Sequence, residues 1–156
     1  MGERAGYRVR QGNEVSNLLR KQWYVGDDET DINALVVGIA QTLMNSPYKL
    51  AHHDETIGGG GVALRNDLNI GRMTSALYHT IYSPPFDSIE NDINCDISDH
   101  GIYEIELVAW NKWKIWNIDV EWKPLKEGKK KLLAEVSFIE GKELKMGTGI
   151  LFKWVK

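Results

Sequence analysis

Apolar residues recur at helical spacing in three segments of the first two thirds of the chain. The first segment spans residues 13–23, the second begins near Thr30 and ends before Pro47, and the third spans residues 69–81. Spacings of three and four residues gather the apolar side chains of a segment on one face, so the pattern predicts two to three helices. Residues 1–12 are polar and contain glycine, and we expect them to be loosely ordered.

The last third of the chain alternates apolar and polar residues, which is typical of strands. A two-residue loop at positions 111–112 sets the expected register of the first hairpin and puts Leu107 opposite Trp116 in a wholly apolar set. The same register puts Trp110 opposite Trp113 on the other face, near the tip of the hairpin. We therefore expect an aromatic pair on the solvent-facing side of the sheet.

A second hairpin follows, and Phe138 and Phe152 share the same alternation in it. Their pairing on one face requires a loop of odd length, and residues 140–142 supply one. The prediction is an α+β fold, in which two to three N-terminal helices pack on one face of a four- to five-stranded antiparallel meander sheet. Leu107, Trp116, Phe138 and Phe152 would all face those helices, and an apolar pocket would lie between the two layers.

The composition indicates one folded domain over residues 1–156, because 42% of the residues are hydrophobic and 26% are charged. The single cysteine, Cys95, excludes an internal disulfide and suits a reducing compartment. The longest strongly apolar run, residues 35–40, is too short to cross a bilayer. We expect a cytoplasmic protein that does not bind a membrane.

Charge is distributed unevenly along the chain. Residues 1–25 carry a net charge of +3, residues 26–111 carry −11 and residues 112–156 carry +5, which leaves −3 for the whole chain. The acidic and basic parts either neutralise each other or form a polarised surface. The lysines of residues 123–131 surround Pro124 and are typical of a solvated hairpin loop, so we do not expect nucleic-acid binding.

The segment from His52 to Gly61 holds the main chemical candidates. His53, Asp54 and Glu55 could act as a general base or activate water. The backbone amides of Gly59 and Gly60 could hold a carbonyl oxygen, because glycine lets a ligand approach the backbone closely. The alternative is a polar loop in which the glycines only provide slack.

We expect neither a metal nor a cofactor. His52 and His53 are adjacent and would point apart, so they do not form a zinc pair. Residues 92–98 copy the first spacings of a calcium loop, but Ile97 stands at the position that requires glycine.

The C-terminal sequence GKELKMGTGILFKWV resembles the closing strands of hotdog-fold proteins. That family wraps a sheet around a long helix, usually dimerises and includes acyl-thioester hydrolases. Helices placed before a curved sheet are also similar to the NTF2-like cone fold. Both resemblances imply a pocket between helix and sheet.

Two functions follow as hypotheses. In the first, the domain binds an apolar or acyl-bearing small molecule between helix and sheet and hydrolyses a thioester with Asp54 or Glu55. In the second, it is a non-catalytic interaction or assembly module, which forms a homodimer or docks a protein partner through Trp110 and Trp113. Trp110 and Trp113 are also candidates for stacking on a ligand.

Overall fold

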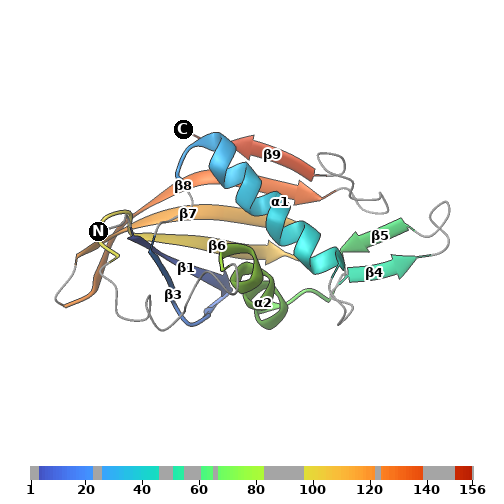
Figure 1. Cartoon of the computed structure of the whole chain (residues 1–156), viewed down its shortest axis with the longest axis horizontal. Coiled ribbons are helices and arrows are strands. Elements are labelled where there is room, and N and C mark those ends of the chain that lie inside the picture. Colours follow the sequence, from blue (N-terminus) through green and yellow to red (C-terminus); the bar gives the residue numbers. More distant parts are fainter. Residues whose placement is uncertain are drawn as a thin grey trace.

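A mixed sheet of seven strands carries two helices on one of its faces (Figure 1). The computed structural model describes residues 4–22, 26–45, 51–54, 61–64, 67–82, 97–121, 124–138 and 150–155. In these ranges the elements are β1 (Arg4–Gln11), β2 (Glu14–Val15), β3 (Leu19–Gln22), α1 (Glu29–Asn45), β4 (Ala51–Asp54), β5 (Gly61–Leu64), α2 (Ile70–Ile81), β6 (Ile102–Ala109), β7 (Lys112–Glu121), β8 (Lys126–Phe138) and β9 (Ile150–Trp154).

The α+β composition agrees with the sequence, but the predicted architecture of helices followed by a four- to five-stranded antiparallel meander is wrong. The main sheet has the order β2, β1, β6, β7, β8, β9, with β3 also paired to β1. β1 lies parallel to β6, and the other strand pairs of this sheet are antiparallel. A separate ribbon contains β4 and β5.

The N-terminal segment is a strand rather than a loose tail. Tyr7 and Val9 face the core, whereas Arg8 and Arg10 alternate with them on the other face of the sheet. The helix expected over residues 13–23 is also absent, because β2 and β3 occupy this stretch. Gly12 has a φ of 62° and turns the chain between β1 and β2, a conformation that glycine adopts without strain.

Both longer predicted helices are confirmed. The Asp28 carboxylate caps α1, because it accepts a hydrogen bond from the Asp31 amide at 2.8 Å. The Asn69 side chain caps α2 through the Arg72 amide at 3.1 Å. The helices bury their apolar faces against the sheet and against each other, and the buried residues are Ile32, Leu35, Val36, Ile39, Ala40, Leu43, Met73, Ala76, Leu77 and Ile81.

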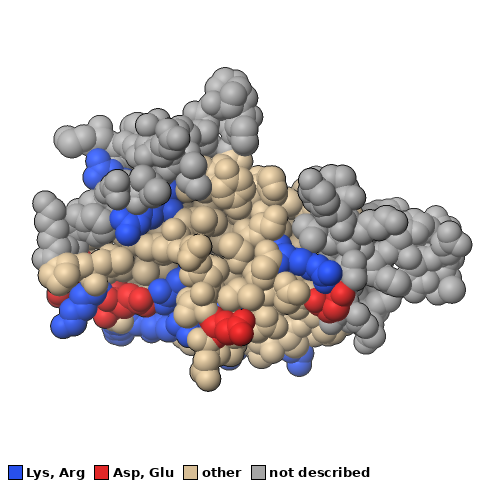
Figure 2. Space-filling model, turned by 90° about the horizontal axis from the view of Figure 1, so that it is seen from below, with Lys and Arg blue, Asp and Glu red and all other residues tan. Residues whose placement is uncertain are grey.

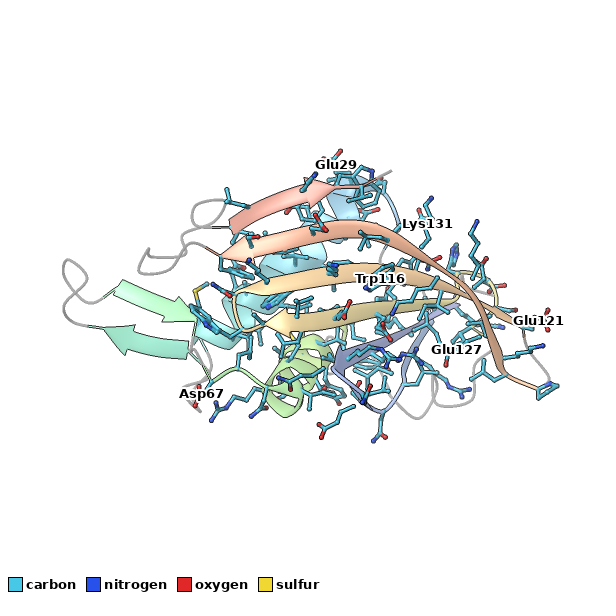
Figure 3. All side chains as sticks on the ribbon, turned by 180° about the vertical axis from the view of Figure 1, so that it is seen from behind. Glu29, Asp67, Trp116, Glu121, Glu127 and Lys131 are labelled. Atoms are coloured by element: carbon cyan, nitrogen blue, oxygen red, sulfur yellow. The ribbon has the colours of Figure 1, made fainter. Side chains whose placement is uncertain are left out.

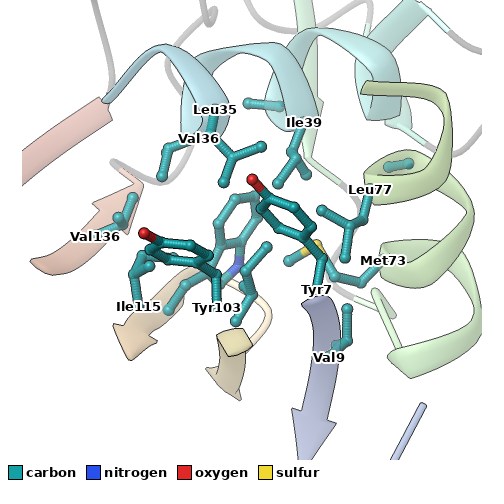
Figure 4. Packing of buried hydrophobic residues seen from close by; sticks show 14 of the residues in the cluster. Tyr7, Val9, Leu35, Val36, Ile39, Met73, Leu77, Tyr103, Ile115 and Val136 are labelled. Carbon is teal, nitrogen blue, oxygen red and sulfur yellow. The ribbon is translucent and has the colours of Figure 1, made fainter. Parts of the chain in front are cut away.

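The space between the helices and the middle of the sheet is packed with side chains (Figure 4). The Tyr7 and Tyr103 rings stack with their centroids 5.5 Å apart. The Trp113 and Phe138 rings lie 4.5 Å apart. These contacts join β1 to β6 and β7 to β8, so the aromatic residues fix neighbouring strands as well as fill the core.

The predicted register of the β6–β7 hairpin is wrong for two reasons. Ala109 pairs with Lys112, so the loop is at residues 110–111 rather than 111–112, and a bulge at Val108 adds a further shift. Leu107 pairs with Trp113, and the irregularity lies between Leu107 and Ala109. The shift turns Trp113 into the core, where it is only 1% exposed, and turns Trp116 to the opposite face of the sheet. Leu107 and Trp116 therefore do not share a face, and the expected solvent-facing pair of Trp110 and Trp113 does not form.

The alternation predicted for β8 and β9 is correct, although the tight loop is not. Val136 pairs with Phe152 on the core side, as their shared parity requires. A regular hairpin with a loop at residues 140–142 requires Phe138 to pair with Leu144, but Phe138 pairs with Ile150; residues 139–149 themselves lie outside the described residues. β8 begins at Lys126, so Lys126, Lys129, Lys130 and Lys131 belong to a strand rather than to a hairpin loop, and Lys123 lies outside the described residues.

The sheet face that the helices leave open, which is seen in Figure 3 with Trp116 on it, carries a row of alternating charges. One residue from each of five neighbouring strands contributes to it, in the order Arg10, Glu106, Lys114, Glu135 and Lys153. Opposite charges face each other across every strand pair of this row, which favours this register. On the face seen in Figure 2, Lys and Arg side chains also lie next to Asp and Glu side chains.

Candidate functional site

The residues of the predicted catalytic segment are only partly described. His53 and Asp54 belong to β4, and their backbones pair with Val62 and Gly61 of β5. The β4–β5 ribbon lies beside the C-terminal end of α1 (Figure 1). Glu55, Gly59 and Gly60 lie outside the described residues, as do Cys95 and residues 92–96. The convergence of His53, Asp54 and Glu55 on a ligand therefore stays a prediction.

The two tryptophans proposed to bind a ligand belong to the core instead. The Trp113 indole nitrogen donates a hydrogen bond to the Trp110 carbonyl at 3.2 Å, and Trp110 packs against the core in a partly buried position. A side chain that is 1% exposed offers no surface to a ligand or partner. Trp113 therefore offers no exposed ring for stacking, and a role of the partly buried Trp110 in binding stays a prediction.

A pocket of about 430 Å³ lies at the end of the sheet where the carboxyl ends of β7 and β9 meet the amino ends of β6 and α1. Its walls come from the segment before α1, the turn before β6, and strands β6 to β9. The lining residues are Asp27, Ser98, Asp99, His100, Gly101, Tyr103, Asn117, Asp119, Val120, Lys131, Leu133 and Trp154.

The strand register explains why the pocket forms at this end of the sheet. Tyr103, Asn117 and Lys131 are direct cross-strand neighbours on β6, β7 and β8. In the next row toward the core, Ile105 and Ile115 are fully buried. The face thus changes from apolar to polar within one row, where Asn117 is partly exposed and Lys131 is exposed.

Three hydrogen bonds fix the turn that forms one wall of the pocket. The Gly101 amide donates to the Ile97 carbonyl at 2.7 Å, and the Gly101 carbonyl accepts a hydrogen bond from the Gly6 amide at 2.8 Å. The Asn117 side-chain amide donates to the His100 carbonyl at 2.9 Å. This wall is therefore fixed before any ligand arrives, which lowers the cost of binding.

The pocket brings titratable groups of both signs together with aromatic rings. Three carboxylates, from Asp27, Asp99 and Asp119, line it together with His100 and the Lys131 ammonium. Among the described residues, no group of three or more His, Cys, Asp or Glu side chains is placed to hold a metal ion. The sequence alone does not point to this site, because its residues come from five separate segments and only the correct register aligns them.

A second charged cluster lies on the open face of the sheet, around Glu104. This carboxylate is fully buried and accepts hydrogen bonds from Arg8 at 2.9 Å, Arg10 at 3.0 Å and Lys130 at 2.5 Å. Arg8 also binds Glu127 through both terminal nitrogens, at 2.9 and 2.6 Å. Because these charges already bind each other, we interpret the cluster as a structural tie between β1, β6 and β8.

The cluster lowers the pKa of both carboxyl groups. Burial acts to raise the pKa of Glu104, but the hydrogen bonds from Lys130, Arg10 and Arg8 outweigh it, and the pKa is lowered. The hydrogen bond from Arg8 lowers the pKa of Glu127. Both groups therefore stay ionised in the fold at a pH where an unfolded chain takes up protons.

We expect this difference to make the fold acid-sensitive. The stabilisation is fully present above the ordinary glutamate pKa of about 4.3 and is lost as the pH falls through the lowered values of the folded state. Urea unfolding between neutral pH and pH of about 3 should show the loss. Glu127→Gln should have a shallower pH dependence than the unmodified chain, and an equal dependence would contradict the assignment.

A comparison of the chain with protein families, curated proteins and solved structures finds no match in any of the three. The resemblance to hotdog and NTF2-like proteins therefore stays a prediction. In the described part of the chain, no helix combines the length and apolar character needed to span a membrane.

Proposed function

We propose that this protein binds a small molecule in the pocket at the end of the sheet. The observation that carries the proposal is the row of Tyr103, Asn117 and Lys131, where the helix-facing side of the sheet turns polar and lines a cavity of about 430 Å³. Ligand sites are typically cavities of about 300 to 1,000 Å³ with a few convergent polar groups. The fixed turn wall and the partly buried Trp154 ring further support this proposal.

The proposal moves the ligand away from the position that the sequence indicated. A molecule held between the helices and the middle of the sheet would have to displace the side chains of the packed core. The end-of-sheet pocket requires no such displacement. Thioester hydrolysis by the segment around His53, the homodimer and a protein partner stay predictions, and the pocket supports binding without assigning a reaction.

Two matched variants on β7 test the proposal. Asp119 lines the pocket and Glu121 does not, although both are exposed acidic residues of the same strand. We expect Asp119→Trp to fill the pocket, because the new ring occupies space beside Asn117 and Lys131. Glu121→Trp makes the same chemical change outside the lining.

The measurement is a fragment screen followed by backbone amide NMR shifts. Fragments that bind should shift the amides of Gly101, Asn117 and Leu133, and these shifts should vanish in Asp119→Trp and persist in Glu121→Trp. Binding that shifts amides elsewhere, or that survives in Asp119→Trp, would refute the proposal. A screen in which no fragment shifts the lining residues would refute it as well.

A further inference from the structure

We propose that the ligand of this pocket is an organic cation, an amine attached to an apolar or aromatic body. This inference rests on the proposed function and specifies its ligand. The cavity itself defines the site, and the groups around it select among the possible ligands.

The charges in the lining favour a cation. Asp27, Asp99 and Asp119 reach the pocket from three different elements, and Lys131 supplies one opposing charge. None of these four residues takes part in the ion pairs among the described residues, which involve Arg8, Arg10, Arg72 and Lys130. Within the described ranges, the carboxylates of the pocket thus have no cationic partner of the kind that Glu104 has, and a bound cation would balance their charge.

An aromatic ring in the lining favours the same class of ligand. The partly buried Trp154 lines the pocket, and the face of an aromatic ring attracts a cation. The molecule already contains such a contact on its open face, where the Lys130 ammonium lies 4.6 Å from the centre of the Trp116 ring. Leu133 and Val120 add apolar surface for the body of the ligand. An anionic ligand would instead meet three carboxylates.

Three compounds of similar size test the charge of the ligand. Phenethylamine is a cation at neutral pH, phenylethanol is uncharged and phenylpropionate is an anion. Titrations followed by NMR at the lining amides should show phenethylamine binding about tenfold more tightly than phenylethanol, with phenylpropionate weakest. Added salt should weaken the binding of the amine more than that of the alcohol.

Variants separate charge from shape. The double variant Asp99→Asn with Asp119→Asn keeps the side-chain volumes. It should lower the affinity for phenethylamine about fivefold and leave the affinity for phenylethanol unchanged. Lys131→Gln should raise the affinity for phenethylamine about threefold. The control is Glu121→Gln, which removes an exposed charge outside the lining and should change neither affinity.

The outcomes distinguish this inference from the proposed function. If phenylethanol or phenylpropionate shifts the lining amides at least as strongly as phenethylamine, the pocket binds ligands but the assignment of a cationic ligand is wrong. This assignment is also wrong if the double variant binds phenethylamine as tightly as the unmodified chain does. It is wrong as well if other fragments bind in the pocket and phenethylamine does not. If no fragment binds in the pocket, both the proposed function and the assignment of a cationic ligand are refuted.

Discussion

Gly101→Ala should lower the free energy of unfolding by roughly 3 to 5 kcal/mol. Gly101 has a φ of 73°, and a Cβ atom there would lie 2.2 Å from the Ile118 carbonyl oxygen and 3.1 Å from its carbon. The obstacle is the backbone of β7, where Ile118 pairs with Ile102, so it cannot move without disturbing the β6–β7 ladder. The variant therefore combines left-handed strain with a clash that has no cheap relief.

Gly12→Ala is the matched control. Gly12 has a similar φ of 62°, but a Cβ atom there would meet nothing within 4 Å. It should cost only about 1 to 2 kcal/mol, the strain of the left-handed backbone alone. Urea unfolding of both variants measures the difference, and equal losses would show that the contact with Ile118 does not matter. Because Gly101 also holds the turn wall of the pocket, its variant should lose fragment binding and Gly12→Ala should retain it.

Glu104→Gln should destabilise the fold by roughly 3 to 5 kcal/mol. The substitution keeps the shape of the side chain but removes the charge that binds Arg8, Arg10 and Lys130. Glu104 is fully buried and Arg8 nearly so, and a buried cation left without its partner costs far more than an exposed one. The effect should therefore exceed that of an ordinary surface substitution.

Glu106→Gln is the control for this variant, because Glu106 lies two residues along the same face of β6. Its carboxylate accepts one hydrogen bond, from the Trp116 indole at 2.9 Å, and a glutamine oxygen can still accept it. We expect a loss below about 1 kcal/mol. Chemical denaturation at neutral pH compares the two variants, and a loss at Glu104 no greater than that at Glu106 would refute the role of the buried cluster.

The parts of the fold that local sequence determines were predictable. The periodicity and the Asn69 cap of α2 are local properties, and so are the alternation and parity of β8 and β9. The apolar stripe of α1 also predicted the residues that it buries. These features depend on neighbours a few positions apart, which a single sequence contains.

The features that failed depend on distant partners or on one inserted residue. The alternation of Tyr7, Arg8, Val9 and Arg10 is a strand pattern, but the short segment gains its stability from β6, far along the chain. The bulge at Val108 leaves no mark in the alternation, yet it reversed which face Trp113 and Trp116 occupy.

The candidate site could not be predicted for the same reason. In the register expected from the sequence, Tyr103 would not face Asn117, so the polar row that lines the pocket would not form. The acidic residues of the lining are separated by long stretches of chain and follow no recognisable spacing. Their convergence is a property of the sheet topology, and a motif search examines only neighbouring positions.

The parallel pairing of β1 with β6 also bears on how the protein is made. Arg8 and Glu104, which meet across this pair, are 96 positions apart in the chain. During synthesis, β1 must wait for Ile102–Ala109 before it gains its long partner. Until then Tyr7 and Val9 lack the β6 neighbours that help to bury them, so the nascent chain exposes these two side chains to chaperones.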